Sequence, residues 1–265
     1  MQQYFKPLFA LLFLIMFTAA CSNETNTDQS AAQHKNISLT ISAAASLKDA
    51  LTDIQKQYEK KHPNIDLKFN FGASGSLQQQ ITNGAPVDLF FSAAEDKFDA
   101  LVKAGAISKE NGADLVGNDL VLIVPKNNTS AITNFEDLSK PTVQKIALGI
   151  PESVPAGQYA KETFEHMNLW KNIEPKTVYA KDVRQVLSYV ETGNVEAGVV
   201  YKTDALISKK VKIVATADNS THKPIVYPVG VIKDSKHPQE AKAFYQFLQS
   251  KTALDTLKKY GFTAN

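Results

Sequence analysis

Short apolar runs alternate with segments of helical periodicity along this chain, and this alternation constrains the fold more than any other feature. The first run, residues 37–41, leads through small residues to Ser46. After it, apolar residues recur every three or four positions, at Leu47, Ala50, Leu51, Ile54 and Tyr58. That spacing predicts a helix with one buried face, which ends before His62 and Pro63. Alternating strands and helices favour an α/β fold with mixed, mainly parallel sheets.

Further runs fit the same scheme. Strands are predicted at residues 39–41, 67–71, 89–92, 120–124, 146–148, 197–201, 213–215 and 225–231. Helices are predicted from Val183 to about Gly193, after Pro155, and, as the last one, after Pro238. In parallel sheets, ligands bind at the carboxyl ends of strands, opposite helix N-termini. Functional residues are therefore expected at the strand-to-helix junctions.

Two turn-rich segments divide the chain. They lie near 117–119 and at 218–224, and they bracket about 100 residues, a plausible size for one lobe. The chain is expected to leave lobe one (37–118 plus 223–265), build lobe two (119–222) and return. Two crossings would form a hinge, with the ligand cleft between the lobes.

The N-terminal segment reads as a targeting signal. The apolar run 8–17 is too short to span a bilayer comfortably, and small residues precede Cys21, the one cysteine of the chain. This predicts a signal peptide at 1–20, lipidation of Cys21, and a lipid-anchored flexible tether at 21–36, where small and polar residues predominate. Ordinary secretory cleavage with an incidental cysteine is the alternative. The protein would then lie outside the cytoplasm, anchored to the cell membrane as a lipoprotein.

Composition excludes several classes of function. The formal charge of +2 comes without a block of one sign, which argues against nucleic-acid binding. A single cysteine leaves no disulfide or cysteine-zinc site, and the five histidines lack metal-ligand spacing. No phosphate-binding G-x-x-x-x-G-K-[ST] loop is present. We expect no catalytic residue, bare metal ion or cofactor.

The strand-to-helix junctions are rich in donors and poor in charge. Five positions are candidates for one anion site: Ser46, Ser74, Ala156, Val183 and Tyr201. Serine and tyrosine hydroxyls, with the free N–H groups of helix N-termini, can hold an anion without lysine or arginine. Taken singly, the serines could be simple N-caps, Ala156 and Val183 core or turn residues, and Tyr201 a strand aromatic. Their joint pattern favours a shared site.

Two charged residues near these junctions have ordinary interpretations. Arg184 is expected to form a structural ion pair with Asp182 or Asp204, and Asp88 to be a turn or cap residue.

Several motifs resemble those of the periplasmic molybdate-binding proteins of ABC transporters. They are AAASL (43–47), FGASGSL (71–77), GAPVDLF (84–90), VPAG (154–157), the segment 191–201 and KYGF (259–262). The resemblance extends over about residues 37–265 and implies a type-two solute-binding fold. It also implies that molybdate is held by Ser46, Ser74, Ala156, Val183 and Tyr201, although either Ser74 or Ser76 could make the shorter contact.

The resemblance further implies a monomer that takes up molybdate, and also tungstate, and delivers it to a membrane permease. Sulfate or another oxyanion is the alternative ligand. A serine hydrolase is the alternative from another class, because Gly72–Ser76 is close to a G-x-S-x-G elbow, but Ser76 replaces its second glycine. No histidine lies at an evident strand end to complete a triad.

Overall fold

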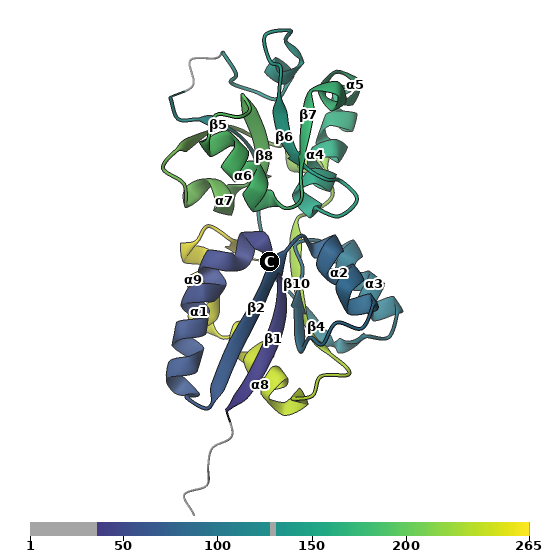
Figure 1. The fold of residues 1–265 in the computed structure, drawn as a ribbon, viewed down its shortest axis with the longest axis vertical. Helices are drawn as coiled ribbons and strands as arrows, with labels where there is room; N and C mark the ends of the chain where they lie inside the picture. Colours follow the sequence, from purple (N-terminus) through teal and green to yellow (C-terminus); the bar gives the residue numbers. More distant parts are fainter. Residues whose placement is uncertain (1–35, 128–130, 265) are drawn as a thin grey trace, which may run out of the picture. The chain divides into compact units, whose positions relative to one another are not determined.

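Two mixed β-sheets with helices beside them form the described part of the protein, in a computed structural model (Figure 1). The structure describes residues 36–127 and 131–264. The predicted signal peptide, Cys21 and nearly all of the tether lie outside them.

Both sheets draw on separated parts of the chain. The first sheet contains β1 (Ile37–Ala44), β2 (Ile65–Gly72), β3 (Leu89–Phe91), β4 (Ile107–Gly117), β10 (Val226–Ile232) and β11 (Thr263–Ala264). The second contains β5 (Leu120–Pro125), β6 (Ile146–Gly149), β7 (Thr177–Ala180), β8 (Ala197–Tyr201) and β9 (Val211–Thr216). The strand orders are β11-β4-β10-β3-β1-β2 and β7-β6-β8-β5-β9.

The helices follow the strands as the alternation predicts. They are α1 (Lys48–Lys61), α2 (Ser74–Thr82), α3 (Glu95–Lys103), α4 (Pro155–His166), α5 (Trp170–Ile173), α6 (Val183–Glu191), α7 (Lys202–Leu206), α8 (Pro238–Leu248) and α9 (Lys251–Lys259). Within residues 36–127 and 131–264, no helix has the length and apolar character needed to cross a membrane.

Strand β1 lies between β2 and β3, and most of its residues are buried on both faces. It pairs in parallel with β2, Ile37 opposite Ile65, and with β3, Ile41 opposite Leu89. Its side chains are almost all apolar or small, which suits a parallel strand covered on both sides. The small residues that follow β1 therefore lie at its carboxyl end, next to the ends of β2 and β3.

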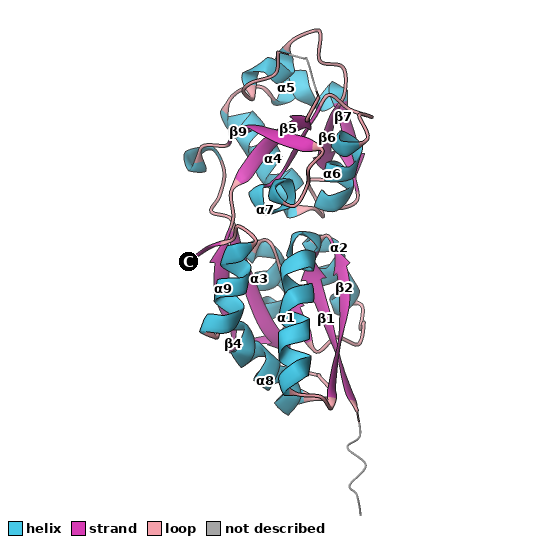
Figure 2. Ribbon diagram, turned by 90° about the vertical axis from the view of Figure 1, so that its left-hand side faces the viewer, coloured by secondary structure: helices cyan, strands magenta, loops and turns pink. Residues whose placement is uncertain are grey.

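The predicted first helix is confirmed as α1. Ala50, Leu51, Ile54 and Tyr58 are buried, and the helix ends at Lys61, just before the His62–Pro63 pair. Helix α1 packs on β2 and on α9 (Figure 2). The helix after Ser46 begins later than predicted, because a short 3₁₀ turn, Ala45–Leu47, precedes it.

The chain passes between the sheets twice. It leaves β4 at Gly117 and enters β5 at Leu120, and it leaves β9 at Thr216 and re-enters the first sheet at Val226. The predicted crossing segments therefore connect strands of different sheets. Movement of two lobes about these segments stays a prediction.

The sheets are mixed, but they are not mainly parallel. Only β1–β2, β1–β3, β6–β7 and β6–β8 pair in parallel in the described chain, whereas β10 runs antiparallel to β3 and β4, and β5 antiparallel to β8 and β9. The reason is the return crossing: the strands that enter or leave a sheet there run against their neighbours.

Several elements escaped the sequence prediction. Strand β4 is mostly polar between Ile107 and Leu115, so it lacks an apolar run, and it is held by backbone pairing with β10 and β11. The helix after Pro238 is not the last, since Ser250 caps α9 by accepting from the Ala253 N–H. Strands β7 and β11 and helices α3, α5 and α7 were also not predicted.

Candidate functional site

One small pocket is lined by all five residues that the sequence nominates. It is narrow: about 10 Å³ is open to the centre of a water-sized sphere, within about 200 Å³ of unfilled space that includes open solvent. Its lining consists of Ala44, Ala45, Ser46, Gly72, Ala73, Ser74, Ala93, Val154, Pro155, Ala156, Val183 and Tyr201. These residues belong to both sheets and their helices, so the pocket is assembled from distant parts of the chain.

The lining residues lie where strands end and helices begin. Ser46 is in the 3₁₀ turn that follows β1, and Tyr201 is the last residue of β8. Ser74 and Val183 are the first residues of α2 and α6, and Ala156 is the second residue of α4. Backbone N–H groups in a first helical turn have no intrahelical partner, so these positions can offer donors to the pocket.

The three helix N-termini keep their positive partial charge. None of α2, α4 and α6 carries an acidic residue in its first turn. One carboxylate oxygen of Asp182, the residue before α6, accepts a hydrogen bond from the Gln185 N–H. The sequence also predicted a helix that begins after Ser46, but Ser46 lies in a three-residue 3₁₀ turn, so three helix N-termini remain at the pocket.

The pocket wall contains no charged side chain. Among its lining residues there is no Asp, Glu, Lys, Arg or His. Every polar side chain in it is a hydroxyl, and Ser46, Ser74 and Tyr201 are each at most 3 % exposed. The described part of the chain also lacks any group of three or more His, Cys, Asp or Glu residues that could hold a metal ion.

Ser74 is held as a hydrogen-bond acceptor on one side. The Ala93 N–H donates to Ser74 Oγ at 2.9 Å. Because a backbone N–H only donates, the Ser74 proton stays available for another partner. Ser76, the alternative in this motif, is exposed and lines a different depression with Gln79 and Glu152.

Tyr201 already has an acceptor in this structure. Its hydroxyl donates to the Ala93 carbonyl across 3.3 Å, which is long for an O–H···O bond. Burial, more than the neighbouring Tyr227, raises the pKa of Tyr201 well above its ordinary value, so the phenol is a neutral donor. Tyr201 can donate a hydrogen bond to an anion only if its hydroxyl gives up this weak bond to the Ala93 carbonyl.

A close backbone contact beside the pocket joins α2 to the turn that precedes α4. The Gly75 N–H donates to the Ser153 carbonyl at 2.9 Å. A Cβ on Gly75 would lie 2.8 Å from both the Ser153 Cα and its oxygen, closer than real side chains approach. Glycine at this position permits the approach.

The nearest charges form a structural cluster. Arg184 contacts the Asp204 carboxylate through Nε and the Asp49 carboxylate through Nη2, both at 2.6 Å. The predicted Asp204 pair is therefore confirmed, while Asp182 is occupied as a helix cap. Asp88 accepts from the Thr40 N–H and from the Ser235 hydroxyl, in agreement with its predicted structural role.

Sequence reasoning missed two residues that contact the site: Tyr227, which lies behind the pocket, and Ala93, which is part of its lining. Tyr227 contacts Ser46, and Ala93 contacts both Ser74 and Tyr201, yet neither lies in a strand-to-helix motif that the sequence marks. Tyr227 is an ordinary strand aromatic by pattern. Only the pairing of β10 with β3 brings it into the neighbourhood of Ser46.

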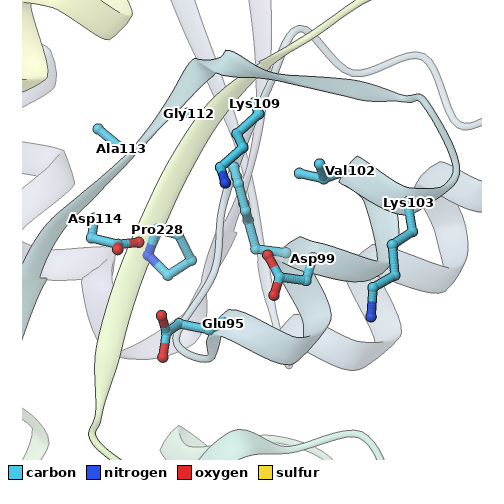
Figure 3. A pocket seen from close by; sticks show the side chains of 10 residues that line it. Glu95, Asp99, Val102, Lys103, Lys109, Gly112, Ala113, Asp114 and Pro228 are labelled. Atoms are coloured by element: carbon cyan, nitrogen blue, oxygen red, sulfur yellow. The ribbon is translucent and has the colours of Figure 1, made fainter.

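A second hollow lies between α3 and β4 and has the opposite character (Figure 3). Three carboxylates line it, Glu95, Asp99 and Asp114, together with Lys103 and Lys109. Burial, followed by the charges of Asp114 and Asp99, raises the pKa of Glu95. A hollow with this excess of carboxylates is unsuited to an anion.

Comparison with known proteins agrees with the fold. The profile of the family described as bacterial extracellular solute-binding protein matches residues 39–263. The chain is 57 % identical over 256 residues to YvgL of Bacillus subtilis, named as an ABC transporter substrate-binding lipoprotein, covering 96 % of each chain. It is 39 % identical over 231 residues to the molybdate-binding protein ModA of Escherichia coli, covering 85 % of this chain and 88 % of the relative.

A solved structure shows the same fold. It is described as the substrate binding domain of a molybdenum ABC transporter from Clostridium difficile, with a TM-score of 0.67 and 44 % identity, covering 86 % of this chain and 99 % of that one. The likeness confirms the predicted α/β fold of the solute-binding proteins.

Proposed function

Since the chain belongs to the family of bacterial extracellular solute-binding proteins, we propose that it binds molybdate in the pocket formed by Ser46, Ser74, Ala156, Val183 and Tyr201. Tungstate, which has nearly the same size and charge, is expected to bind there as well. The protein would deliver the anion to the permease of an ABC importer, as a monomer and without chemical change to its ligand.

The convergence of the five residues carries this proposal. They come from five separate segments of the chain and line a single pocket of hydroxyls and helix N-termini. The relatives named for molybdate or molybdenum share this fold and much of the sequence.

Elementary electrostatics supports a divalent anion. Each helix N-terminus carries the equivalent of about +0.5 charge, so α2, α4 and α6 together nominally offset about 1.5 negative charges. Burying an anion is costly unless each oxygen finds a donor. The serine hydroxyls and first-turn N–H groups supply such donors without a counter-ion.

The lining also disfavours protonated oxyanions. Hydrogen phosphate carries an O–H that needs an acceptor, yet no carboxylate is among the residues that line the pocket. Sulfate, which is fully ionised, stays the alternative ligand. The serine hydrolase alternative has no support, since no histidine belongs to the lining of this pocket.

Calorimetric titration tests the ligand directly. The purified protein would be titrated with molybdate, tungstate, sulfate and phosphate under identical conditions. We expect tight binding of molybdate and tungstate, weaker binding of sulfate and none of phosphate. Preference for phosphate, or no binding of any oxyanion, would overturn the proposal.

A proline substitution tests the role of a backbone donor. Val183 is the first residue of α6 and Asp182 is extended, with φ −159° and ψ 169°, so proline fits the position while its N–H is lost. Val183→Pro should weaken molybdate binding, and Val183→Ala, which keeps the N–H, should weaken it less. Equal losses would show that the Val183 side chain, not its N–H, matters.

The family indicates on which side of the membrane the protein acts, and the N-terminal segment suggests how it is anchored. Members of this family act outside the cytoplasm, and we propose that Cys21 anchors this protein to the membrane by lipidation. The lipoprotein name of YvgL supports the anchor. The tether 21–36 would then let the binding domain reach the permease.

A further inference from the structure

A buried chain of polar groups lies behind Ser46. Ser46 Oγ is 2.9 Å from Tyr227 Oη, and Asn118 Nδ2 is 3.2 Å from Tyr227 Oη and 2.9 Å from Thr203 Oγ1. All four residues are buried. Because buried polar groups must find partners, the direction of each hydrogen bond matters for what remains free.

The orientation of the Asn118 amide is fixed by the backbone. The Asp119 N–H lies 2.9 Å from Asn118 Oδ1. A backbone N–H only donates, so the oxygen of the amide must face it, and the NH₂ group must face Tyr227 and Thr203. Asn118 is therefore a donor to Tyr227.

This orientation determines the direction of the next bond. Tyr227 Oη accepts from Asn118 and has one proton of its own, which we assign to Ser46 Oγ at 2.9 Å, because the other neighbouring hydroxyl, that of Tyr201, is engaged with the Ala93 carbonyl. If Ser46 donated instead, the Tyr227 proton would be buried without this partner, which is costly. Burial raises the pKa of Tyr227 well above its ordinary value, so the phenol keeps that proton.

The consequence appears in the pocket. With its oxygen engaged by Tyr227, Ser46 has its own proton free to point toward the ligand. Ser74 is in the same situation, because the Ala93 N–H donates to its oxygen. Both serines of the pocket thus have their oxygen engaged by a neighbouring group: Ser46 by Tyr227 behind the pocket, and Ser74 by the Ala93 N–H in the pocket wall.

We propose that Tyr227 and Asn118 are positioning residues that fix Ser46 as a donor and so make the pocket select fully ionised oxyanions over protonated ones. This inference rests on the proposed function of the pocket and deepens it. A serine free to rotate can accept a hydrogen bond from the O–H of hydrogen phosphate, whereas Ser46 has one of its two acceptor positions filled by Tyr227 and directs its own proton into the pocket, which disfavours that arrangement. Selectivity then depends on two residues that need not touch the ligand.

The test is the substitution Tyr227→Phe, which removes the hydroxyl but keeps the ring. The ring packs edge-on against Tyr201 and Phe262, so the packing should survive. Affinities for molybdate, sulfate and phosphate would be measured at pH 7.5 by titration and by competition against molybdate. We expect the preference for molybdate over phosphate to fall about tenfold or more, the scale of one unsatisfied buried group.

Sulfate and a second tyrosine are the controls. Sulfate carries no proton, so the molybdate-to-sulfate ratio should stay unchanged in Tyr227→Phe. Tyr58→Phe removes the hydroxyl of another buried tyrosine, whose ring stacks on His62 away from the pocket lining, and should leave both ratios unchanged. An equal loss for all three anions in Tyr227→Phe would indicate a merely structural role and overturn the inference.

A second variant tests the same inference if the Tyr227→Phe protein fails to fold. Asn118→Ala removes the donor that orders Tyr227, and it should lower the molybdate-to-phosphate ratio in the same direction. An unchanged ratio in a folded Tyr227→Phe or Asn118→Ala protein would refute the inference. If the wild-type protein bound no molybdate at all, the proposed function itself would fail, which is a different result.

Discussion

The Arg184 guanidinium donates to the Asp49 carboxylate across 2.6 Å and so joins α6, beside the second sheet, to α1, beside the first. The same guanidinium contacts Asp204 on α7, and its Nη2 lies 3.4 Å from the Ser46 carbonyl. One side chain therefore connects the strand-to-helix turn of Ser46 with the helix that begins at Val183. These two positions form part of the proposed anion site.

Loss of the Asp49 carboxylate should weaken ligand binding by a small amount. In Asp49→Asn the bridge between α1 and α6 loses its charge, and partly exposed pairs contribute about 0.2–1 kcal/mol. We expect molybdate to dissociate up to about fivefold faster in stopped-flow measurements. Asp53→Asn is the matched control. Asp53 lies on the same helix, but its carboxylate contacts Lys56 of α1 and Tyr260 at the end of α9. Equal rates for both variants would contradict the bridging role.

Ser74→Ala should be far more damaging than Ser76→Ala. The buried Ser74 hydroxyl has its proton free for the ligand, while Ser76 is exposed outside the pocket. Removing one donor to a charged group should cost roughly 1.5–3 kcal/mol of binding free energy in calorimetric titration. A Ser76→Ala protein that lost more affinity than Ser74→Ala would move the site to the other hydroxyl.

Gly75→Ala should impair closure of the site around the ligand. The new methyl would meet the Ser153 backbone at 2.8 Å, where nothing flexible can give way. Overpacking of this kind costs about 1–3 kcal/mol, so molybdate affinity should fall about tenfold. The melting temperature of the ligand-free protein should change little, because the ligand-free form can open. A large loss of ligand-free stability together with unchanged affinity would refute this expectation.

The stability of the protein should carry a pH signature of Asp204. Burial, opposed by Arg184, raises the pKa of Asp204 from 3.8 to about 6. Between these values the folded state binds more protons than the unfolded state, so the contribution of Asp204 to the free energy of unfolding falls as pH rises from about 4 to about 6. The two-unit difference corresponds to roughly 3 kcal/mol.

Chemical denaturation at pH 4, 5, 6 and 7 would measure this. The difference in unfolding free energy between wild type and Asp204→Asn should decrease by about that amount across the range. Asp218→Asn is the control: hydrogen bonds from Ser220 lower the pKa of Asp218, so its contribution is lost only below about pH 4, and the corresponding difference should stay nearly constant from pH 4 to 7. If the difference in unfolding free energy between wild type and Asp204→Asn rose with pH instead, the pKa of Asp204 in the folded protein would be lowered, not raised.

Cys21→Ser should release the protein from the membrane. A lipidated cysteine would be the anchor, and serine cannot be acylated in its place. Fractionation of cells that express the variant should move the protein from the membrane to the soluble fraction, while Ser22→Ala stays with the membrane. Retention of Cys21→Ser in the membrane fraction would mean that another segment anchors the chain.

The sequence alone determined the local structure that periodicity encodes. The apolar stripe Leu47 to Tyr58 specified α1, and the run 197–201 specified β8 to the residue. It also nominated five of the lining residues, because a hydroxyl at the end of a strand and a residue that opens a helix are local patterns. Strand β4 and helix α9 were missed, because a mostly polar strand and a short helix behind a serine cap have weak patterns.

Only the tertiary structure decided how these pieces meet. The antiparallel entry of β10 between β3 and β4 places Tyr227 behind Ser46, and the approach of α6 to α1 places Arg184 between Asp49 and Asp204. The contacts of Tyr227 with Ser46 and of Arg184 with Asp49 join residues more than 100 positions apart. Periodicity reports which face of an element is buried, but not which distant side chain it meets, because register and crossing geometry are set by the packing of the whole chain.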